Sequence, residues 1–145
     1  MREILFRGKR KYSGEWVYGY LVKLGKESFS DSERHGIVDK AIPTLGSGVY
    51  YNLAIDEVIP ETVGQYTGFT DTNGKKIFEG DIVNIHKRQW QLIYDNCKGE
   101  VYFNGILYLI KGVSDVLSLY AFRGCCEIIG NIHDNPELLG ENNNG

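Results

Sequence analysis

The amino-acid sequence predicts a mainly β protein built from short strands, with a small barrel-like sheet and at most one or two short helices. Runs of alternating apolar and polar residues recur along the chain, and Gly, Asn, Asp and Ser interrupt them, which is typical of strands joined by turns. The chain contains 10 Tyr and 18 Gly but only 1 Met, and Tyr favours strands. Strands at this spacing are typical of small barrels and curled sheets, and an SH3-like barrel is one arrangement that fits.

The first two predicted strands, over residues 3–7 and 15–23, are expected to form a hairpin. Ser13 and Gly14 lie between them and favour a turn. Side chains two residues apart in a strand point to the same side of a sheet. One face of the second strand therefore carries Trp16, Tyr18, Tyr20 and Val22.

The next part of the chain combines a polar loop with short strands. Residues 25–36 are polar and interrupted by Gly and Ser, which predicts an exposed, mobile loop. Short strands are expected over residues 36–40, 48–54 and 55–59. Pro43 and Pro60 should limit their length, because Pro cannot donate a backbone hydrogen bond within a sheet.

The segment 63–85 carries the strongest turn signals. Asn73 and Gly74 lie between two β-rich runs, and Asn-Gly favours a hairpin because both residues tolerate a positive φ. Gly80 and Asp81 precede an apolar strand, and we expect the Asp81 carboxylate to accept hydrogen bonds from nearby turn amides. These four residues are therefore predicted to form a structural motif rather than a catalytic one.

Further strands and one short helix are expected toward the C-terminus. The strands cover residues 90–95, 100–103, 106–111 and 126–132, with turns at 98–99 and 104–105. Residues 113–120 fit a short helix about as well as a strand. Asn135 followed by Pro136 favours a brief helix through Leu139.

A single domain is expected over residues 1–139. A division into an N-terminal lobe, 1–62, and a barrel-like lobe, 63–139, is the alternative. The tail 140–145 is polar and is predicted to be disordered.

The charge balance and the cysteines indicate a cytoplasmic protein that does not bind membranes. The 16 Lys and Arg and 19 Asp and Glu give a net charge of −3, so no overall field attracts nucleic acid or an anionic membrane. No apolar run is long enough for a signal peptide or a membrane span. Cys97, Cys125 and Cys126 are odd in number and two are adjacent, unlike the paired pattern of a secreted disulfide framework.

The chemically reactive residues form no recognisable catalytic or metal-binding motif. Adjacent strand residues point to opposite faces, so His133 and Asp134 are expected on the surface rather than as an acid–base pair. His86 is expected on a solvent face. Cys125 and Cys126 lack the C-x-x-C spacing of zinc sites. We therefore expect no catalytic residues, no metal and no cofactor, and the sequence favours a protein that is not an enzyme without establishing it.

Two basic, aromatic clusters are the candidate binding residues. They consist of Arg7, Lys9, Arg10, Lys11 and Tyr12 near the N-terminus and of Lys87, Arg88 and Trp90 further along the chain. Basic side chains contact phosphates and aromatic rings stack on bases, so these residue types suit a nucleic-acid surface. Solvated hairpin turns are the alternative, and the acidic net charge favours it.

Three segments resemble the YopX family of phage and prophage proteins. They are residues 3–21 (EILFRGKRKYSGEWVYGYL), 67–83 (TGFTDTNGKKIFEGDIV) and 127–139 (EIIGNIHDNPELL), and they follow the family's order over nearly the whole chain. The resemblance implies a YopX-like arrangement of strands and a phage or prophage origin. It implies no activity, cofactor or catalytic residue. Any specific function is expected in the segments that align poorly, 25–36 and 95–112.

Three functions are compatible with these features. The preferred one is a non-catalytic interaction protein that binds a host or phage protein through a loop or a sheet edge, with the tyrosines as anchors. The alternatives are a small β-barrel protein that binds nucleic acid in phage DNA or RNA metabolism, and an enzyme with a dispersed site. Self-association is also compatible with the sequence.

Overall fold

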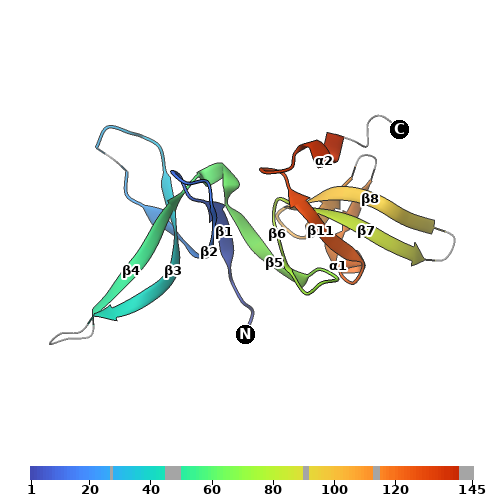
Figure 1. Cartoon of the computed structure of the whole chain (residues 1–145), viewed down its shortest axis with the longest axis horizontal. Helices are drawn as coiled ribbons and strands as arrows, with labels where there is room; N and C mark the ends of the chain where they lie inside the picture. Colours follow the sequence, from blue (N-terminus) through green and yellow to red (C-terminus); the bar gives the residue numbers. More distant parts are fainter. Residues whose placement is uncertain (27, 45–49, 90–91, 113–114, 141–145) are drawn as a thin grey trace. The chain divides into compact units, whose positions relative to one another are not determined.

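Eleven strands and three short helical segments make up the part of the chain that the structure describes. This computed structural model describes residues 1–26, 28–44, 50–89, 92–112 and 115–140, but not the side chains of 41–44, 50–52, 87–89 and 92–96. The chain divides into two compact units, Met1–Gln65 and Tyr66–Gly145 (Figure 1). The prediction of a mainly β protein with at most short helices is confirmed.

The first unit is an antiparallel sheet with the strand order β4-β3-β2-β1. These strands are β1 (Phe6–Lys9), β2 (Trp16–Leu24), β3 (Arg34–Thr44) and β4 (Tyr50–Val58). The 3-10 helix η1 (Pro60–Thr62) follows β4. Gly64 and Gln65, the first residues of β5 (Gly64–Thr70), then pair with β1. The predicted hairpin of β1 and β2 is confirmed, and Gly14 in its turn has a φ of 72°.

The long hairpin of β3 and β4 corrects the prediction of three short strands (Figure 1). β3 begins at Arg34, so the expected loop 25–36 ends earlier than predicted. Pro43 does not end the strand but pairs in register with Tyr51. β2 pairs with β3 only as far as Val38, so no described strand on that side needs the N–H that Pro lacks.

The residues that follow β1 pair with the end of β4 and so connect the first and last strands of the sheet at one corner. Arg10 forms a bridge with Val58, and the N–H of Lys11 donates to the carbonyl of Glu57 at 2.9 Å. The N–H of Ile59 donates to the carbonyl of Lys9, also at 2.9 Å. One end of β4 is therefore paired on both of its sides.

The core of the first unit lies on one face of this sheet. Its members are Val17, Ile37 and Val58, with Phe6, Leu21 and Val63 packed against them. Gly19 allows the close approach of the strands, because a Cβ there would meet the carbonyl oxygen of Val38.

The second unit contains a five-stranded antiparallel sheet in the order β10-β9-β8-β7-β11. Its strands are β7 (Asp81–Gln89), β8 (Leu92–Phe103), β9 (Tyr108–Lys111), β10 (Val116–Ser118) and β11 (Cys126–Asn131). Residues 66–70 of β5 form a hairpin with β6 (Lys76–Phe78). Two short helices complete it, α1 (Leu119–Phe122) and α2 (Glu137–Gly140). The described ladder is open, with β10 and β11 at its ends, so it is not a closed barrel.

The turn predicted at residues 98–99 is wrong, because β8 runs through it without a break. Gly99 instead permits close packing against Ile110, because a Cβ at this position would lie 2.5 Å from the Ile110 side chain. The turn at 104–105 is confirmed, with a φ of 99° at Gly105. Residues 113–120 fitted a helix about as well as a strand, and 113–114 lie outside the described residues. The rest contains both elements: strand β10 ends at Ser118, which also caps the helix α1.

The core of the second unit is larger than that of the first. Its buried members are Ile77, Val83, Ile85, Val101, Ile110, Leu119, Phe122 and Cys126. The chain alternates across β7, so Val83 and Ile85 face this core. None of the described helices has the length and apolar character that a membrane-spanning helix needs.

Candidate interaction surface

Arg10 and Lys11, from the predicted N-terminal basic cluster, are engaged by carboxylates of their own unit. The Arg10 guanidinium lies 2.9 Å from the Glu15 carboxylate and 3.1 Å from that of Asp56. The hydrogen bond and charge of Asp56 raise the pKa of Arg10 above its usual value. Lys11 Nζ lies 3.1 Å from Glu57. These contacts reduce the positive field that the cluster presents to solvent.

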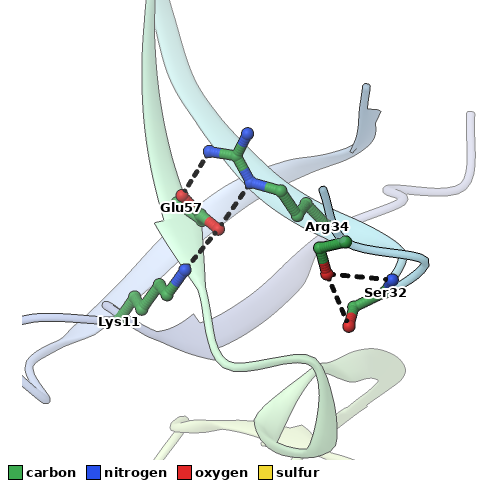
Figure 2. A network of polar contacts seen from close by, with 5 residues as sticks. Lys11, Ser32, Arg34 and Glu57 are labelled. Carbon is green, nitrogen blue, oxygen red and sulfur yellow. Dashed lines mark hydrogen bonds and ion pairs between the residues drawn. The ribbon is translucent and has the colours of Figure 1, made fainter. Parts of the chain in front are cut away.

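Glu57 is the centre of this network, between Lys11 and Arg34 (Figure 2). Arg34 Nε donates to Oε1 at 2.9 Å, and a second guanidinium nitrogen donates to Oε2 at 2.7 Å. Such a bidentate pair is both stronger and more directional than a single ion pair. The hydrogen bond from Arg34, followed by that from Lys11, lowers the pKa of Glu57 to about 2.

The remaining residues of the N-terminal cluster have different environments. Arg7 is buried, and its guanidinium lies 4.6 Å from the ring centre of Trp16. Lys9 Nζ lies 5.6 Å from the same ring. Tyr12 is 89% exposed at the turn. The structure therefore brings Arg7 and Lys9 together on one indole ring instead of presenting both as a solvent-facing charged pair.

The second predicted cluster lies only partly within the described residues. Lys87 and Arg88 belong to β7, but their side chains are outside the description, and Trp90 lies outside it altogether. The two clusters belong to different units of the chain.

An apolar strip on the outer face of the first unit was not among the predicted binding residues. Tyr18 and Tyr20 are 45% and 62% exposed on β2, and Leu53 and Ile55 are 54% and 43% exposed on β4. Tyr20 pairs with Val38, which pairs with Ile55, so all three side chains lie on one side of the sheet. The opposite side carries the core. We call Tyr18, Tyr20, Leu53 and Ile55 the outer strip.

The sequence indicated two residues of the outer strip but not that they are exposed. Its two-residue period placed Tyr18 and Tyr20 on one face of β2, but periodicity does not tell which face is buried. Val17 and Gly19 face the core instead, where the narrow space beside Gly19 excludes large side chains. Leu53 and Ile55 join the strip only through the pairing of β3 with β4.

Three residues of the predicted structural motif can be placed by their local geometry. Gly74 and Gly80 have φ values of 79° and 84°. Asp81 is buried, and its carboxylate accepts a hydrogen bond from the Phe78 N–H at 2.8 Å. The sequence analysis missed Asp71, which accepts hydrogen bonds from Asn73 and Lys75 and, across 57 residues, from Ile128.

One histidine lies next to a cysteine in the fold, because the His86 N–H donates to the Cys125 carbonyl at 3.0 Å. His86 is exposed, with its Nε2 3.9 Å from Glu127. Cys126 is fully buried, whereas Cys125 is half-buried, and burial raises the pKa of Cys126 to about 12. His133 and Asp134 lie in a turn held by Asn131, whose Oδ1 accepts from both of their N–H groups. Among the described residues, no three His, Cys, Asp or Glu side chains gather closely enough to hold a metal ion.

The fold and this surface define a class of small, two-unit, antiparallel β protein. Comparison with known proteins specifies it further: the family model "YopX protein" matches residues 5–140, and the chain belongs to the YopX family. The crystal structure of protein EF1440 from Enterococcus faecalis is similar, with a TM-score of 0.63 and 24% sequence identity. The similarity covers 96% of this chain and 99% of that one. No curated protein matches the chain significantly.

Proposed function

We propose that this YopX protein is a non-catalytic interaction protein of phage or prophage origin that binds a host or phage protein through the outer strip. The observation that carries this proposal is the exposure of Tyr18, Tyr20, Leu53 and Ile55 together on one face of the sheet. Tyr is enriched at protein interfaces because its ring supplies apolar area and its hydroxyl remains satisfied at a wet rim.

The distribution of tyrosines supports binding over a purely structural role. Tyr12, Tyr18, Tyr20 and Tyr120 are exposed, although a core of tyrosines was the simpler explanation for their abundance. The charges nearby also favour a protein partner, since Arg10 and Lys11 are held by Asp56, Glu15 and Glu57 and are less available to phosphates.

Site-specific photocrosslinking tests the proposal. A benzophenone amino acid replaces Tyr20 in one variant and Tyr12 in the control, which is also exposed but lies in the turn outside the strip. In phage-infected or lysogenic cells, the probe at position 20 is expected to give a discrete protein adduct that the probe at position 12 does not give. Adding Tyr18→Ser should reduce that adduct while the fold, followed by circular dichroism, is retained.

Equal adducts from both positions, or none from position 20, would contradict the proposal. An adduct to nucleic acid at position 20 would instead support the alternative function. The two kinds of adduct are separated by nuclease and protease digestion before mass spectrometry.

A further inference from the structure

The edges of the described sheets differ in how they are protected. β6 and β10 are only 3 residues long. The outer side of β11 is covered, because the Ile128 N–H donates to Asp71 at 3.1 Å and the Cys126 carbonyl accepts from Thr72 at 2.9 Å. Short length and capped backbone groups are devices by which proteins keep sheet edges from pairing with other chains.

Among the described residues, β4 is a long edge for which no such protection is seen. It has 9 residues, and over Tyr50–Asp56 no described strand pairs with it on the side away from β3. Backbone groups alternate in direction along a strand, and the Glu57 carbonyl points outward because it accepts from Lys11. The N–H and C=O groups of Leu53 and Ile55 therefore also point to the open edge.

The residue types of this edge do not discourage pairing either. Residues 50–55, with the sequence YYNLAI, contain no charge and no Pro. Leu53 and Ile55 are substantially exposed. The acidic residue that follows them, Asp56, is already paired with Arg10. An exposed, uncharged edge strand with apolar side chains is the kind that pairs with another strand.

We propose that β4 pairs antiparallel with β4 of a second copy of this chain, about a two-fold axis at Leu53. The bridge of Arg10 with Val58 occupies one end of the edge, so the open stretch of the described strand is Tyr50–Asp56, and its midpoint is Leu53. In this register Tyr50 lies opposite Asp56 of the second copy, and Leu53 lies opposite Leu53.

A second copy fits this edge for reasons of charge and symmetry. Antiparallel pairing places each Asp56 beside an uncharged residue, whereas parallel pairing would place the two Asp56 side by side. The two-fold arrangement uses the open β4 edge of both copies, so this pairing ends at a dimer. It also joins the two outer strips into one continuous surface. The inference goes beyond the proposed function, because partner capture at Tyr20 does not require the dimer.

Two substitutions at one position test the pairing. Leu53→Pro removes the outward N–H but no hydrogen bond to β3, which is the setting in which an edge strand tolerates Pro. Leu53→Ala is the matched control that shortens the side chain and keeps the N–H. By sedimentation velocity at tens of micromolar, we expect the wild-type protein at twice 16.4 kDa, Leu53→Ala still mainly dimeric, and Leu53→Pro monomeric with unchanged circular dichroism.

Disulfide trapping tests the register and does not depend on how Leu53→Pro folds. Residues opposite each other in a hydrogen-bonded antiparallel pair have Cα atoms about 5.5 Å apart, which a disulfide can span. Mild oxidation of Leu53→Cys is expected to give a reducible covalent dimer, whereas Tyr20→Cys and the wild-type protein give little. A wild-type protein that is monomeric at 100 μM, or the same trapping from positions 53 and 20, would overturn the proposal.

Discussion

The Asp71 carboxylate accepts a hydrogen bond from the backbone N–H of Ile128 at 3.1 Å and so connects the β5–β6 turn to the outer edge of β11. Its other oxygen accepts from the N–H groups of Asn73 and Lys75, each at 2.9 Å. A single buried side chain thus shapes the turn and caps a strand edge that would otherwise be open.

Asp71→Ala should destabilise the protein by about 2 to 4 kcal/mol, because three backbone donors lose a charged acceptor in a buried place. Asp71→Asn should destabilise the protein less, because its remaining side-chain oxygen can still accept the hydrogen bonds from Asn73 and Lys75. Its NH2 group would face the Ile128 N–H, so that one hydrogen bond would be lost. Urea unfolding followed by circular dichroism measures both. Asp115→Ala, at an exposed aspartate, is the control, and an equal loss in that variant would contradict the role of Asp71.

Glu57 should make the first unit sensitive to acid. Its pKa is about 2 in the folded protein, below the ordinary 4.5, so the stability it contributes is complete above about pH 4.5. That stability is lost as the pH falls from 4.5 toward 2. Glu57→Gln should therefore flatten the pH dependence of unfolding between pH 5 and 2, relative to the wild type and to Glu137→Gln. A carboxyl signal of Glu57 that titrates near 4.5 by NMR would disprove this.

Gly74 and Gly99 should resist substitution for different reasons. Gly74→Val is expected to reduce the stability by about 1 to 2 kcal/mol through strain at its positive φ. Crowding does not contribute, because a Cβ there has open space around it. Gly99→Ala should cost about 1 to 3 kcal/mol through crowding against Ile110. Ile110→Leu removes the methyl group at the contact. It should therefore recover part of the stability lost in Gly99→Ala but none of that lost in Gly74→Val. A double-mutant cycle from thermal unfolding measures this coupling.

Nucleic acid should bind weakly. Because the carboxylates beside Arg10 and Lys11 compete with phosphates, we expect dissociation constants above about 10 μM for random oligonucleotides at physiological salt. Fluorescence anisotropy measures this for single-stranded and duplex DNA. A submicromolar complex that weakens steeply with salt, and that the combined Lys9→Gln, Arg10→Gln and Lys11→Gln substitutions abolish, would favour the nucleic-acid function.

The thiols should differ in reactivity. Cys126 is buried, its Sγ donates to the Phe122 carbonyl at 3.1 Å, and its pKa is about 12. At pH 8 it should therefore remain a protected thiol, while the half-buried Cys97 and Cys125 react with iodoacetamide. Peptide mass spectrometry of the labelled protein identifies the sites. Elemental analysis of the unlabelled protein should find no stoichiometric zinc, and one equivalent lost on Cys125→Ser with Cys126→Ser would refute that expectation.

The local elements of this protein were predictable because turn chemistry and periodicity are properties of short segments. Asn73 and Gly74 predicted their turn, Gly14 its hairpin, and Asp81 its contact with a turn amide. Gly99 was misread, because a Gly that permits close packing and a Gly that makes a turn look the same in a sequence. Its role depends on Ile110, which lies on another strand.

The sequence by itself determined the family, the β class and most of the turns. Only the tertiary structure decided which face of β2 is exposed and which acids neutralise the basic turn. Tyr20, Val38 and Ile55 meet through strand register, and Lys11 and Glu57 meet across 46 residues. Such contacts arise when distant strands pair, and no local pattern encodes the partner that a strand will choose.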